Sequence, residues 1–270
     1  MSPPPLFKHQ SDAVQKAKLC KNIALFFKPR LGKTRTALEI FSEFRKESPD
    51  LKLLVVCRKS LIETTWAEEA AKFTGYKFQS YLDLDIDIDI DIDNLKDIVA
   101  INYELLISKN HLARVTKLLK TGTWMCVCDE SSVMRSHSSK TVKTLLSIRA
   151  LFKHRIVMSG SPAPNSLLEF WAQIKFIQWT ALPDSFFRFR NLYFHLERGG
   201  KTLRGQFVCP SQLRNFYSKG WEYKISPENH RKLIDAISPY CCFVEKKDVA
   251  EVSFPKNIEK IISVDLSPEE

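Results

Sequence analysis

The sequence predicts an α/β fold in which a parallel sheet is flanked by helices. Five short apolar runs lie between residues 23 and 158, and segments with helical periodicity separate them. The runs are continuously apolar and do not alternate, which is typical of strands covered on both faces of a parallel sheet. Alternating strands and helices with right-handed crossovers then build a doubly wound domain. The five runs are Ile23–Phe27, Leu53–Cys57, Ile98–Ile101, Trp124–Cys128 and Arg155–Met158.

Beyond about residue 178 the pattern changes. Phe186–Phe194 is dense in aromatic residues and arginine, which predicts a packed helix with a basic face or, alternatively, a surface on which bases stack. Gly199-Gly200 predicts a turn between two extended runs. Ser226-Pro227 predicts the start of a helix that ends at Pro239. In the first part of the chain, helices are expected over residues 13–19, 36–44, 66–73, 112–119, 140–151 and 167–177.

The charge balance favours a polyanionic partner. The 270 residues carry a net charge of +10, although six aspartates alternate with apolar residues from Asp83 to Asp93. Without that tract, 41 basic residues face 25 acidic ones, a net charge of +16. This excess favours nucleic acid first and an acidic membrane surface second, with a basic protein that binds neither as the alternative. The tract offers only a line of like charges and is interpreted as a low-complexity surface insertion.

The spacing of the cysteines and the length of the apolar runs indicate the cellular compartment of the protein. The seven cysteines form no C-x-x-C pair, which argues against a zinc site and against a disulfide framework. No apolar run approaches the ~20 residues of a membrane span, and the N-terminal stretch Met1–Leu6 lacks the features of a secretory signal. Reduced core cysteines and a cytoplasmic location are therefore expected.

A candidate phosphate-binding loop follows the first apolar run. Phe27–Thr34 ends in Gly-Lys-Thr and leads into a helical segment, the strand–loop–helix order whose backbone N–H groups bind phosphates. In such a loop Lys33 reaches the β- and γ-phosphate oxygens, and the Thr34 hydroxyl binds Mg²⁺. Phe27 stands where the pattern has its first glycine. Pro29 has no N–H, which limits the expected donors to residues 30–34.

An acidic pair, Asp129-Glu130, directly follows the fourth run. In a nucleotide hydrolase, Asp129 holds Mg²⁺ directly or through water, and Glu130 orients and deprotonates the attacking water. Acidic pairs also occur as caps of the next helix. Because the carboxyl ends of parallel strands share one edge of the sheet, a Gly-Lys-Thr loop after another strand favours the hydrolase.

Taken in order, these motifs resemble the first motor lobe of superfamily-2 helicases, and more narrowly the Swi/Snf-type DNA translocases, especially the short forms found in phages. The resemblance covers nearly the whole chain and implies a RecA-like fold. It matches Phe7–Gln10 to the motif that reads adenine, which puts Gln10 on the base, and it matches a phosphate loop that often lacks the first glycine. The nucleotide-binding residues that it implies are Phe7, Gln10, Arg30, Leu31, Gly32, Lys33, Thr34 and Arg35.

The resemblance also implies residues that contact nucleic acid. The motif whose loop touches one DNA strand corresponds to Arg58, Lys59 and Ser60 with Trp66, and the next strand-contacting motif corresponds to Asn102 and Tyr103. The acidic box is Asp129-Glu130-Ser131-Ser132, where the family more often ends in alanine and histidine, so Ser132 stands in the place of the histidine that would contact the coupling motif. That coupling motif, which links the nucleotide state to DNA, comprises Ser159, Gly160, Ser161, Pro162 and Asn165.

The implied organisation is a RecA-like ATP-binding lobe over residues 1–178, a mainly helical family-specific insertion over 179–250, and a connector over 251–270 toward a second lobe. The expected function is the ATP-binding lobe of a DNA-dependent ATPase, a translocase or a remodeller of branched DNA. ATP and Mg²⁺ are the expected cofactors, and DNA and a second RecA-like lobe, in the same protein or in a separate chain, the expected partners. Lys33, Asp129 and Glu130 would carry the chemistry. The alternatives are a non-catalytic half-motor that binds DNA or a partner, and a small-molecule kinase, which leaves the coupling motif without a role.

Overall fold

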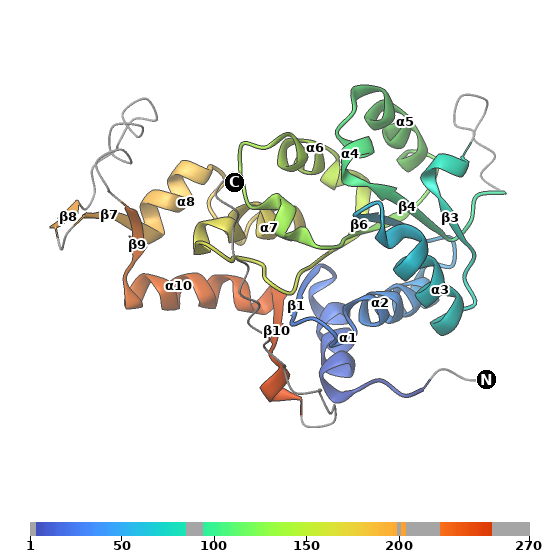
Figure 1. Cartoon of the computed structure of the whole chain (residues 1–270), viewed down its shortest axis with the longest axis horizontal. Coiled ribbons are helices and arrows are strands. Elements are labelled where there is room, and N and C mark those ends of the chain that lie inside the picture. Colours follow the sequence, from blue (N-terminus) through green and yellow to red (C-terminus); the bar gives the residue numbers. More distant parts are fainter. Residues whose placement is uncertain (1–3, 85–93, 199–200, 204–221, 250–270) are drawn as a thin grey trace, which may run out of the picture.

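The computed structural model describes residues 4–84, 94–198, 201–203 and 222–249. They form a seven-stranded parallel sheet with helices on both faces, in the strand order β10-β1-β6-β5-β2-β4-β3 (Figure 1). This architecture confirms the predicted α/β fold. The strands are β1 (Ile23–Phe27), β2 (Lys52–Cys57), β3 (Phe78–Ser80), β4 (Ile98–Asn102), β5 (Trp124–Cys128), β6 (Phe152–Met158) and β10 (Cys241–Val244).

Successive residues of each strand enter two separate apolar cores. In β1, Ala24 and Phe26 join the core shared with α4 to α8 and α10, whereas Leu25 and Phe27 join the core shared with α1 to α3. Because both faces are covered, β1 and β5 are apolar at every position, as the sequence indicates. The helices are α1 (Lys8–Cys20), α2 (Lys33–Glu47), α3 (Glu68–Phe73), α4 (Tyr103–Leu106), α5 (Lys109–Leu119), α6 (Lys140–Ile148), α7 (Phe170–Ile177), α8 (Phe186–Tyr193) and α10 (Pro227–Ile237).

The five predicted strands are all present in this sheet, and its other two strands, β3 and β10, were not predicted. Of these, β10 corrects the predicted division of the chain, because it lies within residues 179–250 and yet pairs in parallel with β1. The strand has four residues and comes directly after the turn at Pro239, so no periodicity distinguishes it from the end of a helical region. The main sheet therefore extends past the predicted boundary at residue 178.

A second, three-stranded antiparallel sheet lies beyond α8, at the left of Figure 1. Its strands β7 (Phe194–Arg198) and β8 (Lys201–Leu203) pair on either side of the predicted glycine turn, and β9 (Glu222–Ile225) pairs with β7. The helix α8 buries Phe189 and Arg190, which confirms the packed-helix interpretation of the aromatic segment. The glycine pair, residues 85–93 of the aspartate tract and the predicted connector 251–270 lie outside the described residues.

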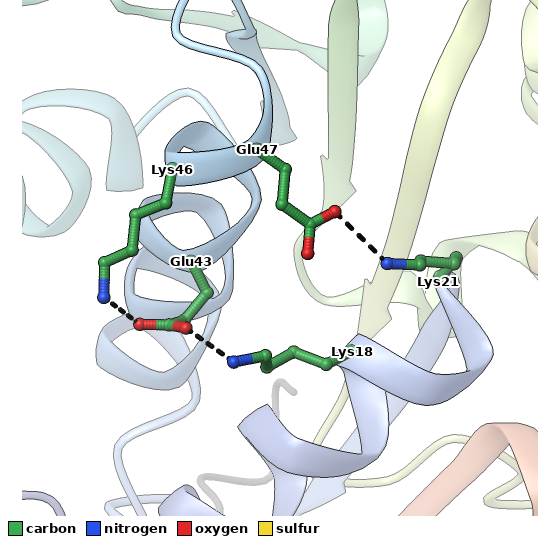
Figure 2. A network of polar contacts seen from close by, with 5 residues as sticks. All are labelled: Lys18, Lys21, Glu43, Lys46 and Glu47. Carbon is green, nitrogen blue, oxygen red and sulfur yellow. Dashed lines mark hydrogen bonds and ion pairs between the residues drawn. The ribbon is translucent and has the colours of Figure 1, made fainter.

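The helices α1 and α2 lie side by side and run in the same direction. Ala13, Val14 and Ala17 of α1 are buried, and lysines near its C-terminal end pair with glutamates of α2 (Figure 2). The contacts are Lys18 Nζ to Glu43 at 2.9 Å, Lys21 Nζ to Glu47 at 3.3 Å, and a further pair between Lys46 and Glu43. Exposed pairs of this kind each contribute about 0–1 kcal/mol, so the apolar contact is what mainly joins the two helices.

No helix within the described residues is long and apolar enough to cross a membrane.

Candidate functional site

The predicted phosphate loop connects β1 to α2. Gly32 is the N-cap of α2 and has φ 73°, and Arg30 also lies in the left-handed region with φ 70°. The first N–H groups of a helix have no partner within it and attract anions. Lys33 folds back over the loop and donates to the carbonyl oxygen of Phe27 at 3.2 Å. This geometry places an ammonium group and free helix N–H donors in one concave turn.

The N-terminal segment closes one side of this loop. Gln10 is 2% exposed, accepts a hydrogen bond from the Phe7 N–H at 3.0 Å, and donates to the Gly32 carbonyl at 3.4 Å. A Cβ at Gly32 would lie 2.2 Å from Gln10 Nε2 and would displace that amide, and the positive φ of Gly32 favours glycine there. Gln10, predicted to read adenine, thus caps α1 and contacts the phosphate loop, while the Phe7 ring is 39% exposed.

His9, absent from the predicted site residues, also contacts the loop. Its Nε2 lies 3.0 Å from the Leu31 carbonyl, and its ring stacks on Phe7 with centroids 6.0 Å apart. Leu31 is buried, and its N–H donates to the Lys28 carbonyl at 3.3 Å, which removes one of the phosphate donors expected over residues 30–34. The Arg35 guanidinium lies 4.7 Å from the Phe73 ring, and Arg30 is exposed.

Asp129, at the end of β5, is held by four hydrogen bonds. Its N–H donates to the Val56 carbonyl at 2.8 Å, and its carbonyl accepts from the Tyr103 hydroxyl at 2.8 Å. Carboxylate Oδ1 accepts from the Glu130 N–H at 2.8 Å, and Oδ2 accepts from the Trp66 indole N–H at 3.0 Å. Trp66 reaches this position from a π-helical turn, Ile62–Ala67, that precedes α3. π-Helical turns are rare and concentrate at functional sites.

The electrostatics of the acidic pair follow from this enclosure. Burial raises the pKa of Asp129 above its ordinary value, while the Trp66 hydrogen bond and, more weakly, the charge of Lys33 act in the opposite direction. Glu130 has φ 48°, a conformation that is uncommon for a residue with a side chain and that concentrates at functional sites. The effect of the Lys33 charge on the pKa of Asp129 shows that the two side chains lie close enough to interact, although 96 positions separate them in the sequence.

The predicted metal ligands, Thr34 and Asp129, are 9% and 4% exposed. Their hydroxyl and carboxylate oxygens are hard donors of the type that Mg²⁺ takes, and Mg²⁺ is usually held by one or two protein groups with water and phosphate oxygens. An ionised carboxylate has about four acceptor positions. The Asp129 carboxylate accepts two hydrogen bonds, so it has room to bind a metal as well. No group of three or more His, Cys, Asp or Glu side chains in the described part of the chain is arranged to hold a metal by itself.

The predicted nucleic-acid residues separate into two sets. Arg58, Lys59 and Ser60 are exposed in the turn after β2, at the same edge of the sheet as the acidic pair. Asn102 and Tyr103 are 8% and 5% exposed, and both side chains are used inside the protein. The Asn102 amide oxygen caps α4, and the Tyr103 hydroxyl supports Asp129. Asn102 is the N-cap of α4 and Tyr103 its first residue, so both side chains have partners inside the protein, and their contact with nucleic acid stays a prediction.

The predicted coupling motif forms the loop after β6, between the phosphate loop and the acidic pair. Ser159 is buried, its N–H donates to the Leu25 carbonyl at 3.2 Å, and its hydroxyl accepts from the Ser161 N–H at 3.1 Å. Gly160 lies against the phosphate loop, since a Cβ there would be 3.0 Å from Pro29 Cδ. The Asn165 amide donates to Glu169 at 3.0 Å. The Pro162 carbonyl accepts from Gln173 of α7, a residue that no sequence motif indicates.

A comparison with protein families matches residues 16–270 to the SNF2-related domain. The chain belongs to this family. Among curated relatives, the human DNA repair and recombination protein RAD54-like is 23% identical over 250 residues, which cover 88% of this chain and 31% of the relative. The human transcriptional regulator ATRX is 31% identical over 91 residues, covering 34% of this chain and 4% of ATRX. This SNF2-related domain therefore spans about a third or less of these relatives.

Among solved structures, the SWI2/SNF2 ATPase core of Sulfolobus solfataricus in complex with double-stranded DNA superposes with a TM-score of 0.68. It is 22% identical, and the match covers 92% of this chain and 46% of that one. The same core without DNA gives a TM-score of 0.67 at 20% identity. These matches confirm the predicted Swi/Snf-type fold. The relatives named here are from human and an archaeon and give no support to the predicted phage-like form.

Proposed function

We propose that this chain is the ATP-binding lobe of a DNA-dependent ATPase that translocates along DNA or remodels branched DNA. The observation that carries the proposal is the order of loops along one edge of the sheet. The neighbouring strands β1, β6, β5 and β2 end in the phosphate loop, the coupling loop, the acidic pair and the exposed turn Arg58–Ser60. A nucleotide bound at one end of this row and DNA bound at the other would be connected through adjacent loops.

Each residue at the nucleotide end has a role that its geometry supports. Lys33 would leave the Phe27 carbonyl for the β- and γ-phosphate oxygens, and the first N–H groups of α2 would bind the remaining phosphate oxygens. Thr34 and Asp129 would hold Mg²⁺. When bound, Mg²⁺ supplies charge neutralisation to the transferred phosphoryl group. Glu130 would orient the attacking water and accept its proton. The exposed Phe7 ring would lie against the base, with Gln10 beside it.

The DNA end of the row rests on Arg58, Lys59 and Ser60, which are exposed donors suited to backbone phosphates. The Sulfolobus solfataricus relative was solved with double-stranded DNA, and the positive charge of this chain agrees with such a partner. Turnover would also need a second RecA-like lobe, since arginines supplied to the transferred phosphoryl group contribute roughly 10³–10⁵ in rate in related phosphoryl-transfer enzymes.

Two substitutions test the proposal. Lys33→Ala should abolish ATP binding by removing the ammonium group, and Glu130→Gln should retain binding and remove turnover by removing the base. The measurements are nucleotide affinity by titration of mant-labelled ATP, and ATPase rate without nucleic acid and with single-stranded DNA, duplex DNA or RNA, each with and without a second RecA-like lobe. Full DNA-stimulated activity in both variants would sink the assignment. Binding without turnover in wild-type protein supplied with a second lobe would instead favour the non-catalytic half-motor.

A further inference from the structure

A buried amide connects the acidic box to the coupling loop. Gln173, on α7, is 0% exposed. Its Oε1 accepts a hydrogen bond from the Ser131 hydroxyl at 2.7 Å, and its Nε2 donates to the Pro162 carbonyl at 2.6 Å. The second Nε2 hydrogen lies toward the Glu169 carbonyl, 3.2 Å away and one helical turn earlier. One side chain therefore joins a residue of the acidic box to a residue of the coupling loop.

The orientation of this amide is determined by its partners. Two carbonyl oxygens lie at one end and can only accept, so the NH₂ group must point toward them. The Ser131 hydroxyl then donates to the oxygen at the other end. A buried network with all its members satisfied specifies one arrangement, and removing a member leaves a buried polar group unpaired. Gln173 thus sets the separation between Ser131 and Pro162.

Both ends of the bridge lie next to groups assigned above. Ser131 directly follows Glu130, whose neighbour Asp129 is tied through Trp66 to the π-helical turn that follows Arg58–Ser60. At the other end, Pro162 is two residues from Gly160, which contacts Pro29 of the phosphate loop. A continuous chain of contacts therefore leads from the exposed basic turn to the phosphate loop. Gln173 is the side chain that carries this chain of contacts from the acidic box to the coupling loop.

We propose that Gln173 is a positioning residue that couples the binding of nucleotide to the binding of DNA, an inference that rests on the function proposed above. The bridge runs through Ser131 and α7 and not through Ser132, which occupies the usual histidine position of the acidic box. Coupling is a free energy between two sites and acts equally in both directions. Loss of the bridge should therefore weaken the effect of each ligand on the other without preventing either from binding.

The test measures this coupling directly. The affinity of the chain for a fluorescein-labelled DNA duplex is measured by anisotropy with and without saturating Mg²⁺ and ATPγS, and the affinity for mant-ADP is measured with and without duplex. In wild type the nucleotide should change the DNA Kd by about fivefold or more, the lower end of typical coupling. In Gln173→Leu this factor should fall below about twofold, with each single-ligand Kd within about twofold of wild type.

Three further variants separate coupling from folding. Ser131→Ala should reduce the factor in the same way, and Ser131→Ala combined with Gln173→Leu should be no worse than Gln173→Leu alone, because both remove one connection. Gln178→Leu is the matched control, since that glutamine lies at the end of the same helix and contacts Thr180 and Tyr240. It should keep the wild-type factor. Melting temperatures show whether each variant is folded under the assay conditions.

The possible results distinguish the two proposals. If wild-type protein binds no nucleotide or no nucleic acid, the proposed function fails and this inference fails with it. If wild type binds both, a coupling factor near one, or an unchanged factor in folded Gln173→Leu, overturns the role of Gln173 and leaves the proposed function standing. A lowered melting temperature with an unchanged factor would assign Gln173 to stability alone.

Discussion

At the scale of single residues, the Asp129 carboxylate is positioned by a side chain that is distant from it in the sequence. The Trp66 indole N–H holds Asp129 Oδ2 at 3.0 Å although 63 positions separate the two residues. This bond does two things at once: it satisfies a buried carboxylate oxygen, and it fixes the direction in which the remaining acceptor positions point. Hydrogen-bond partners that orient a metal ligand typically change metal affinity or activity about 10–100-fold when removed.

Trp66→Phe should therefore weaken the metal-dependent step. The substitution keeps most of the apolar volume and removes the donor to Asp129, so the Mg²⁺ concentration that half-saturates mant-ATP binding should rise by about tenfold. Trp124→Phe is a close control, because Trp124 is equally buried and its indole nitrogen has no hydrogen-bond partner among the described residues. Equal Mg²⁺ dependence in the two variants would show that Trp66 acts only through its volume.

The site residues that sequence could predict are those whose chemistry lies in consecutive positions. Lys33 and Asp129 each belong to a short motif directly after an apolar strand, and the parallel sheet then brings the two together. Trp66 and Gln173 act through partners 63 and 42 positions away, and no local pattern indicates which side chain they meet. Tyr103 is an opposite case. The sequence around it resembles a motif that contacts nucleic acid, but its hydroxyl donates to the Asp129 carbonyl inside the protein.

At the scale of elements, the predicted strands agree with the structure because each is covered by helices on both faces of the sheet. The strands of this sheet that were not predicted, β3 and β10, lie at its edges and are less completely covered. All three positions of β3 are only partly buried, and β10 lies at the opposite edge with Phe243 46% exposed. Edge strands with mixed burial lack the continuous apolar signal. The helix α2 begins at Lys33, three residues before its apolar pattern, because Gly32 turns the phosphate loop directly into the helix.

The contact between β6 and α2 includes a histidine that should make stability depend on pH. His154 is 6% exposed, its ring stacks on Phe44 at 4.0 Å, and its Nδ1 lies 3.1 Å from the Lys21 carbonyl. Burial lowers the pKa of His154 from 6.5 to about 4. Between these values the unfolded chain binds a proton that the folded chain does not, so folding loses stability as the pH falls.

His154→Gln should remove this part of the pH dependence. In wild type the contribution of His154 is complete above pH 6.5 and is lost progressively down to pH 4. The full shift corresponds to about 3 kcal/mol, and solvent screening of the partly enclosed ring reduces the expected loss to about 2 kcal/mol. Urea unfolding at neutral and mildly acidic pH measures the difference, which should shrink in the variant. His230→Gln, at an exposed position of α10, provides the comparison. If the two variants lose stability on acidification by the same amount, the buried histidine is not the source.

At the scale of the whole molecule, the first helix and the last strand of the described residues, α1 and β10, meet beside β1. β10 joins the sheet next to β1, and the Lys28 N–H at the start of the phosphate loop donates to the Val244 carbonyl at 3.0 Å. α1 contacts the other end of β10, where Cys241 is in register with Ala24, and Lys16 Nζ donates to the carbonyls of Ser238 and Cys241, each at 2.7 Å. The C-terminal part of the described structure thus supports the nucleotide end of the site.

Lys16→Met should consequently affect both stability and nucleotide binding. The substitution keeps the apolar stem and leaves two carbonyls without their charged donor, and since hydrogen bonds to charged groups contribute about 1.5–3 kcal/mol, we expect a loss of about 2 kcal/mol in unfolding free energy. Amides of residues 241–244 should exchange faster, and nucleotide affinity should fall because β10 borders the phosphate loop. Lys18 lies on the same helix as Lys16 and pairs with Glu43 of α2. Lys18→Met should therefore cost no more than about 1 kcal/mol and leave the amide exchange of residues 241–244 unchanged. Matching losses and exchange rates in the two variants would rule out a specific connection between α1 and β10.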